Sequence, residues 1–221
     1  MAIQEIDGLR VSNWDIVVGC ERLTEGCDSC PSYWEYKENG LDYNARYNPS
    51  VLLAPLDNPN PTKYTVGIGS DLFHEAVTVE TLASVFGVMN QAHWHFFEIA
   101  TKRAERMYCV SNDFQWGRNI SLAVAVESGD YKWRIGYLRK SKAIIKAVSM
   151  VPLLGDMGKL DLSGIAIVGV QPETWGLKRE MKQSWYDSVK LQCFEQGVIF
   201  YENETYLYSH GELKCPERPY Q

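Results

Sequence analysis

Three cysteines, Cys20, Cys27 and Cys30, lie close together near the start of the chain in the pattern C-x6-C-x2-C. On one glycine-containing loop, three thiolates can converge on a single metal centre. Two centres suit this donor set: a tetrahedral zinc that recruits a fourth ligand, and a [4Fe-4S] cluster in which three cysteines leave one iron open. A third interpretation is that the thiols bind nothing and pack as small apolar side chains.

The zinc interpretation needs a fourth ligand from a distant part of the chain. The other cysteines and histidines are Cys109, Cys193, Cys215, His74, His93, His95 and His210. None of them forms a second C-x2-C pair, which is the usual sign of a structural zinc site. The spacing therefore favours a three-cysteine cluster and leaves zinc as the alternative.

The elements that position this loop are predicted from apolar patterning. Runs rich in β-branched residues predict buried strands at 16–20, 64–70, 95–101, 120–127, 143–150, 164–170 and 197–203. Helical spacing of apolar residues predicts helices at 79–92, 131–141 and 182–197. Strands alternating with helices indicate a parallel sheet with right-handed crossovers, so we expect an α/β fold, a partial (β/α) barrel of six or seven strands. The helical signal within 102–119 is weak.

Length and composition favour one domain over residues 1–221. The chain is 45% hydrophobic and 12% aromatic, which supplies enough apolar material for one large core and excludes a disordered chain or a disulfide-stapled miniature fold. Residues 40–63 are rich in Asn and Pro and predict an irregular excursion, and 211–221 predict a surface tail.

Charge and missing motifs narrow the function. A formal net charge of -6 argues against non-specific attraction to nucleic acid over the whole surface. The N-terminus lacks signal-peptide features and no long apolar run is present, so we expect a soluble cytoplasmic protein without a membrane partner. Gly-x-Ser-x-Gly, P-loop and Gly-x-Gly-x-x-Gly patterns are missing, which leaves hydrolase, NTPase and Rossmann dehydrogenase functions without support.

An ordered series of short motifs runs along most of the chain. It comprises VGC at 18–20, EGCDSC at 25–30, SDLFHE at 70–75, TKRAERM at 101–107, AVE at 125–127, PLLG at 152–155, IVG at 167–169 and QCFEQGVIFY at 192–201. In this order the motifs resemble those of a phage-associated branch of the radical S-adenosylmethionine (SAM) superfamily, related to spore photoproduct lyase. The resemblance implies a partial TIM-like barrel of the radical SAM type, with a cluster loop at 18–36.

The resemblance implies two cofactors, a [4Fe-4S] cluster and SAM. Cys20, Cys27 and Cys30 would bind the cluster, and the turn at Ser70 and Asp71 would contact the SAM amino group. A carboxylate is a suitable partner for an ammonium. The structural alternative is that Ser70 or Asp71 caps a helical turn.

Polar residues at the ends of two further strands are expected to meet the same cofactor. Thr101 and Lys102 are predicted cofactor-binding residues, and Lys102 is also a catalytic candidate. Lys102 or Arg103 would hold the SAM carboxylate or a substrate phosphate, and Glu127 would bond a ribose hydroxyl of SAM. The alternatives are a surface ion pair for Arg103 and a structural salt bridge for Glu127.

The last strands supply the candidates for the substrate side. Gln171 and Glu202 are predicted catalytic residues, and Glu173, Arg179 and Asn203 are predicted to bind substrate. The alternative for each is a loop side chain that faces water. Gln171 also stands within a segment where the family carries an acidic residue, which is a departure that predicts an altered substrate pocket.

The expected activity is hydrogen abstraction from a nucleobase, or from a hypermodified thymine-type nucleotide in phage DNA, in the manner of a base-modification isomerase. The partners implied are a nucleotide or DNA substrate and a reductant such as flavodoxin or ferredoxin, in the cytoplasm of a bacterium or a phage-infected host. Two alternatives remain open: a base-lesion repair lyase of the spore photoproduct lyase type, and a non-catalytic zinc-binding module.

Overall fold

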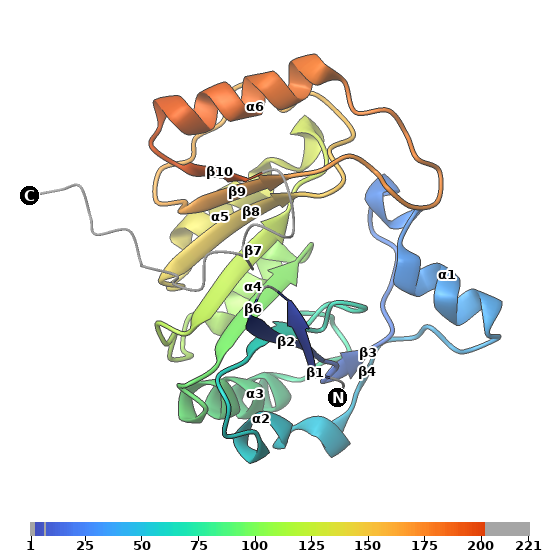
Figure 1. The fold of residues 1–221 in the computed structure, drawn as a ribbon, viewed down its shortest axis with the longest axis vertical. Coiled ribbons are helices and arrows are strands. Elements are labelled where there is room, and N and C mark those ends of the chain that lie inside the picture. Colours follow the sequence, from blue (N-terminus) through green and yellow to red (C-terminus); the bar gives the residue numbers. More distant parts are fainter. Residues whose placement is uncertain (1–2, 7, 202–221) are drawn as a thin grey trace, which may run out of the picture.

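A computed structural model describes residues 3–6 and 8–201 and is built around one eight-stranded sheet (Figure 1). In spatial order the strands are β1 (Ile3–Ile6), β2 (Leu9–Trp14), β5 (Lys63–Val66), β6 (Phe96–Thr101), β7 (Ile120–Ala125), β8 (Ile145–Met150), β9 (Ile167–Val170) and β10 (Ile199–Tyr201). β1 pairs antiparallel with β2, and all the other neighbours in this sheet are parallel. Glu202, Asn203 and the predicted tail lie outside the described residues.

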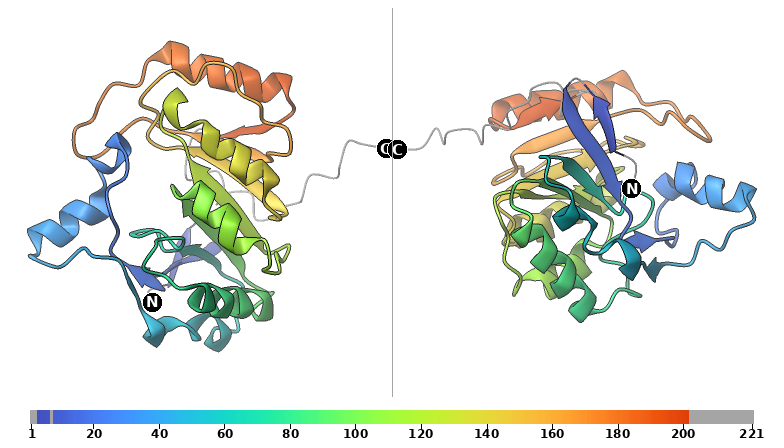
Figure 2. Two further views of the ribbon diagram at one scale, coloured as in Figure 1. Left: turned by 180° about the vertical axis from the view of Figure 1, so that it is seen from behind. Right: turned by 60° about the horizontal axis from the view of Figure 1, so that its bottom comes forward.

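Four main helices cover one face of this sheet. They are α3 (Val79–Gln91), α4 (Ala104–Ser111), α5 (Trp133–Lys140) and α6 (Gln183–Glu195). Figure 2 shows all four on the same side of the strands, as crossovers between parallel neighbours require. The helices predicted at 79–92, 131–141 and 182–197 are confirmed, whereas α4 lies in the segment where the helical signal was weak.

The prediction of a first main-sheet strand at 16–20 is wrong. Within this range, only β3 (Val17–Val18) is extended, and β3 pairs with β4 (Arg46–Tyr47) in a separate two-stranded sheet. The strand that joins the main sheet is β2, whose sequence LRVSNW has no continuous apolar run and carries two consecutive polar residues, Ser12 and Asn13. Gly19 ends the extension after β3, with φ of 75° and a backbone so close to Asn44 that a Cβ would clash.

The main sheet has seven parallel strands plus antiparallel β1, which matches the upper end of the predicted strand count. Its order begins at β1 and finishes at β10, so the described residues form an open sheet and no closed barrel. The fold is mixed α/β. Within those residues, no helix has the length and apolarity that crossing a membrane requires.

The cluster loop lies at the carboxyl ends of the strands, and the excursion at 40–63 leads from there back to the amino end of β5. The remaining short elements are η1 (Glu25–Cys27), α1 (Pro31–Glu38), η2 (Pro49–Val51), α2 (Ala54–Asp57) and η3 (Gly129–Tyr131). α1 begins with a proline at its first position, where the missing N–H costs no hydrogen bond. In Figure 1, α1 lies apart from the helical face, beyond the strand ends.

Candidate metal and cofactor site

A cavity of about 410 Å³ opens at the carboxyl ends of the parallel strands. Parallel strands finish at the same edge of a sheet, so the residues that follow them converge there. The wall includes the three cysteines and the predicted site residues Ser70, Asp71, Thr101, Lys102, Arg103, Gln171 and Glu173. The structure therefore brings together residues that span more than 150 positions of sequence.

The three cysteines are half-buried in this wall. In the described residues 3–6 and 8–201, one group of three potential metal ligands has all its ligand atoms within 4.8 Å of one another. This group is Glu21, His74 and Glu75, and not the three cysteines. At least one pair of the three cysteine sulfurs is therefore more than 4.8 Å apart. A tetrahedral zinc with Zn–S bonds of about 2.3 Å would hold its sulfurs about 3.8 Å apart.

Cys27 lies against a buried ion pair. Lys102 Nζ donates to Cys27 Sγ at 3.2 Å and to Thr24 Oγ1 at 3.0 Å, and it also contacts Glu127 Oε1. Glu127 is fully buried, accepts from Thr24 Oγ1 at 2.6 Å and pairs with Arg134 at 3.0 Å. The cluster loop thus packs against the charged side chains Lys102, Glu127 and Arg134 at the ends of β6 and β7.

Neighbouring opposite charges, more than burial, set the direction of the pKa shifts of Glu127, Lys102 and Cys27. Burial alone would raise the pKa of Glu127, but Lys102 and its hydrogen bond outweigh burial and lower that pKa. Burial would lower the pKa of Lys102, and Glu127 raises it above its usual value. For Cys27, burial raises the thiol pKa, but the charge of Lys102 and backbone hydrogen bonds together lower it by more, so the net pKa falls. This environment favours a thiolate, the form that binds metal.

Asp71 organises the neighbouring strand end. Its Oδ1 accepts from the Thr101 hydroxyl at 2.7 Å and from Phe73 N at 2.9 Å, and its Oδ2 accepts from Lys102 N at 3.1 Å. Arg103 NH1 lies 3.3 Å from the same Oδ2. This carboxylate is 5% exposed and has a structural role that includes the predicted turn cap. Its contact with the SAM amino group stays a prediction.

Cys20 and Cys30 have their own neighbours. Arg103 NH1 lies 4.0 Å from Cys20 Sγ, and the Tyr43 hydroxyl lies 3.8 Å from Cys30 Sγ. Burial, followed by the charge of Asp71, raises the pKa of Cys20. Burial and the neighbouring Cys30 raise the pKa of Tyr43, which keeps its hydroxyl a donor.

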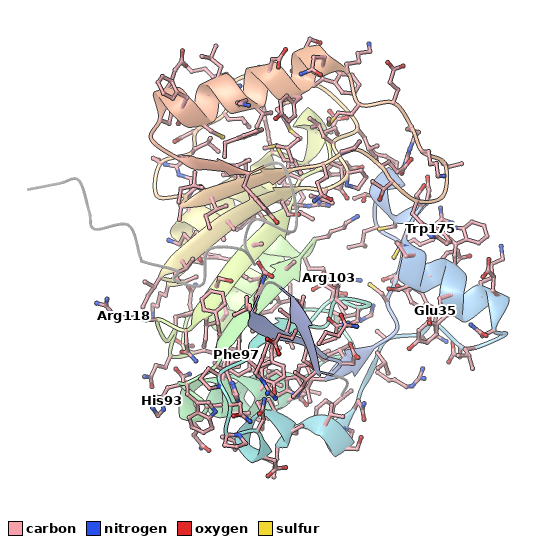
Figure 3. All side chains as sticks on the ribbon, in the orientation of Figure 1. Glu35, His93, Phe97, Arg103, Arg118 and Trp175 are labelled. Atoms are coloured by element: carbon pink, nitrogen blue, oxygen red, sulfur yellow. The ribbon has the colours of Figure 1, made fainter. Side chains whose placement is uncertain are left out.

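A loop after β9 holds the cluster loop from the other side. Glu173 accepts from Arg179 Nε at 3.0 Å and from Arg179 N at 2.8 Å, and Arg179 NH2 reaches the Glu25 carbonyl oxygen at 2.8 Å. Ser29 Oγ accepts from Leu177 N at 2.9 Å. Figure 3 shows Trp175 of the same loop close to α1. Glu173 and Arg179, predicted to bind substrate, thus bind each other and the cluster loop.

Glu127 and Ser70 both have structural partners within this chain. Glu127 forms the structural salt bridge that was its alternative, because both of its oxygens are occupied by donors of this chain. The Ser70 hydroxyl donates to Val17 O at 2.8 Å and fixes the turn against β3. Gln171 lines the cavity as a catalytic candidate should.

Three contributors to this site carry no signal in the sequence. Thr24 lies between the cysteines without matching any ligand pattern, Tyr43 falls in the irregular excursion, and Arg134 is on a helix that reads as a crossover. Arg134 lies 7 positions from its partner Glu127. The partners of Tyr43 and Thr24, which are Cys30 and Lys102, lie farther away in the sequence. Only the tertiary fold brings them to the cavity.

The close group Glu21, His74 and Glu75 is an ion-pair network. His74 Nδ1 accepts from Ala76 N at 3.1 Å, so a neutral ring carries its proton on Nε2, which then cannot bind a metal. Burial lowers the pKa of His74, which favours that neutral ring. Arg103 already lies 2.7 Å from Glu75 and 3.5 Å from Glu21.

Residues 10–212 match the family described as protein of unknown function, DUF5131. The chain belongs to this DUF5131 family. No curated protein and no solved structure matches the chain. The match of this DUF5131 member spans the cluster loop, the strand ends and the loop after β9, so the whole candidate site lies within the family region.

Proposed function

We propose that this DUF5131 protein is a radical SAM enzyme. Cys20, Cys27 and Cys30 would hold a [4Fe-4S] cluster, and the 410 Å³ cavity beside them would receive SAM and substrate. The observation that carries the proposal is the convergence of three half-buried thiols on a cavity at the strand ends. In a [4Fe-4S] cluster of this kind three cysteines leave one iron open for SAM.

The architecture supports the same proposal. An open parallel sheet with crossover helices on one face and a site at the strand carboxyl ends is what a partial (β/α) barrel provides. We propose on this basis that the fold is a partial barrel of the radical SAM type. Residues 18–36 then form the loop that carries the cluster across the mouth of the half-barrel.

The fit of the residues to the cofactors is chemical as well as spatial. When bound and reduced, the cluster would supply the electron that cleaves SAM and generates a 5′-deoxyadenosyl radical for hydrogen abstraction. Lys102 favours the thiolate form of Cys27, and Asp71 holds Thr101 and the Lys102 backbone rigidly at the wall. Rigid walls that exclude water are what a radical reaction demands of its protein.

The substrate part of the proposal is a nucleobase, or a modified thymine-type nucleotide in DNA, in an isomerisation. It is based on the motif resemblance and is supported by the cavity wall, where Tyr33, Tyr43 and Trp175 offer aromatic faces and Lys102, in a group of net positive charge with Glu127 and Arg134, offers a cation. Aromatic rings stack on bases and cations pair with phosphates. A reductant of the flavodoxin or ferredoxin class would supply the electron.

The decisive experiment is anaerobic reconstitution of the full chain with iron and sulfide. We expect about four irons and four sulfides per chain, by the cluster stoichiometry, and an EPR signal after dithionite reduction that SAM perturbs. The Cys27→Ala variant should lose this signal because it lacks one ligand. Cys109→Ala is the matched control, since Cys109 is exposed on α4 and should leave the signal unchanged.

Two results would contradict the proposal. Protein that holds zinc but neither iron nor sulfide after anaerobic purification would leave the non-catalytic zinc module. A cluster whose EPR signal does not change when SAM is added would contradict the presence of an open iron that binds SAM. Accumulation of 5′-deoxyadenosine would show that SAM is consumed. Regeneration of SAM would indicate the reversible use expected of a repair lyase.

A further inference from the structure

Each of the three cysteine sulfurs lies against a different side-chain donor. The pairs are Lys102 Nζ with Cys27 Sγ at 3.2 Å, Tyr43 Oη with Cys30 Sγ at 3.8 Å and Arg103 NH1 with Cys20 Sγ at 4.0 Å. Two of these donors are cations from adjacent positions at the end of β6. Arg103 is labelled in Figure 3 on the side of the sheet that faces the cluster loop.

The surroundings of the two cations differ in charge. Lys102 shares its buried partner Glu127 with Arg134, so this group of three carries a net charge of +1 beside Cys27. Arg103 is in contact with the three carboxylates Asp71, Glu75 and Glu21, so that group carries -2 beside Cys20. The cluster site is therefore electropositive on its Cys27 side and electronegative on its Cys20 side.

Burial fixes the positive side in place. Glu127 is 0% exposed and the Arg134 side chain is 3% exposed, so neither ion can turn into water without breaking the core. Lys102 is held by three contacts, to Thr24, Cys27 and Glu127, and cannot move away from the sulfur cheaply. In such a low-dielectric setting, a charge acts on its neighbour more strongly than at the surface.

We propose that Lys102 sets the reduction potential of the cluster and that Glu127 moderates it. This inference rests on the proposed function, since it needs a [4Fe-4S] cluster on the three cysteines. With three thiolate ligands, such a cluster carries a charge of about -1 when oxidised and about -2 after one electron arrives from the reductant. A cation donating to Cys27 stabilises the more negative form, and therefore raises the potential.

Lys102 and Glu127 are positioning residues in this scheme, because both act through the Cys27 ligand. The scheme predicts shifts of opposite sign at the two positions. Removing the ammonium lowers the potential, whereas neutralising Glu127 leaves Lys102 and Arg134 uncompensated and raises it. A purely structural ion pair would give no such reversal, since both substitutions would only loosen the loop.

The test is a redox titration of the reconstituted full-length protein, followed by EPR without SAM. We expect Lys102→Met to cut the ratio of reduced to oxidised cluster at a fixed potential by about tenfold, which is a shift of 59 mV to more negative values for one electron. Lys102→Arg should restore most of the wild-type potential. Glu127→Gln should shift it to more positive values.

Lys146→Met is the matched control. Lys146 is a partly buried lysine on β8 whose ammonium donates to the Arg139 carbonyl oxygen at 3.0 Å, and it does not line the cavity. Its replacement should leave the midpoint potential unchanged. Iron and sulfide content measured on every sample shows whether a cluster is present before its potential is compared.

The outcomes separate this inference from the proposed function. If wild-type protein assembles no cluster, the proposed function fails and this inference fails with it. If the variants assemble clusters with wild-type potentials, or if both shift in the same direction, the inference alone is overturned. If Lys102→Met holds no cluster, the comparison of Lys102→Gln with Glu127→Gln tests the inference instead. The inference requires a more negative midpoint potential in Lys102→Gln and a more positive one in Glu127→Gln.

Discussion

Glu173 is a buried carboxylate that depends on a single cationic partner. Its side chain is 3% exposed, and Arg179 donates to it through both the backbone N and the guanidinium. These hydrogen bonds outweigh burial and lower the pKa of Glu173 to about 2. Because Arg179 also reaches the Glu25 carbonyl oxygen, the pair fastens the loop after β9 to the cluster loop.

The depressed pKa predicts a pH window for stability. The folded pKa lies below the unfolded value of 4.5, so the pair stabilises the fold above about pH 4.5 and loses this effect as the pH falls towards 2. The contribution is at most about 3 kcal/mol. Glu173→Gln should lower the unfolding free energy of metal-free protein at pH 6 and converge with wild type near pH 2.

Urea unfolding between pH 2 and 6 measures this difference. Glu35→Gln is the control, because Glu35 is exposed on α1 and its replacement should leave the stability curve parallel to that of wild type. A deficit in Glu173→Gln that is constant over the whole range would show that the Glu173 charge does not stabilise the fold.

At this scale the sequence predicts the residues of the cavity wall better than their surroundings. Cysteine spacing singles out Cys20, Cys27 and Cys30, and polar residues at strand ends single out Thr101 and Lys102. All five line the cavity, and the signals that indicate them are local. The partner of a buried charge is a tertiary property. Glu127 was predicted as a ribose ligand, but its pairing with Arg134 across a turn could not be predicted from residue types alone.

Two glycines allow the cluster loop to lie flat against its neighbours. A Cβ at Gly26 would come within 2.6 Å of Glu127 Oε1, and a Cβ at Gly176 would come within 2.6 Å of Ser29 Cβ. Gly176 also has φ of 66°, which side chains rarely adopt. The loop is thus packed between the end of β7 and the loop after β9 at van der Waals distance.

Gly26→Ala should lift the cluster loop from Glu127. Because Glu127 is fully buried and bound on both oxygens, it cannot yield easily, and overpacking of this kind costs about 1–3 kcal/mol. We expect a lower melting temperature and a lower iron content after reconstitution. Thermal unfolding by circular dichroism and iron analysis measure the two effects.

Gly87→Ala provides the comparison for this substitution. Gly87 lies within α3, and a Cβ there would meet no atom within 4 Å. Alanine should stabilise the helix by up to about 1 kcal/mol and leave iron binding unchanged. Equal melting temperatures for Gly26→Ala and Gly87→Ala would show that the loop is free to move at Gly26.

Helices and interior strands were predictable because they bury continuous or periodic apolar faces. β7 is buried along nearly its whole length, which explains why its run of Ile, Leu and Val residues is a clear signal. β2 was not predicted because a polar residue, Ser12, occupies a buried position beside Asn13, which interrupts the apolar pattern that predicts a strand. α4 was not predicted because its buried residues are Ala104, Met107 and Ser111, of which only Met107 is large and apolar.

One hydrophobic core connects the whole of the described chain. Trp14 of β2, Phe97 of β6, Leu122 of β7, Val168 of β9 and Val189 of α6 belong to a single buried cluster. The rings of Trp14 and Phe97 are 5.6 Å apart. The cavity therefore sits at one edge of a continuous sheet, with no second core beneath it in the part of the chain that the structure describes.

A single core predicts a single unfolding transition, and Leu122→Ala tests this. Leu122 is fully buried on a central strand, so the substitution should cost about 2–5 kcal/mol. Far-UV circular dichroism and tryptophan fluorescence should shift together, because the strand borders both halves of the sheet. Leu191→Ala on α6, where the side chain is 56% exposed, should change stability by less than about 0.5 kcal/mol. Transitions that separate in Leu122→Ala would mean that the strands on either side of β7 fold independently, and the cavity would then lie between two units whose relative placement the cofactors must fix.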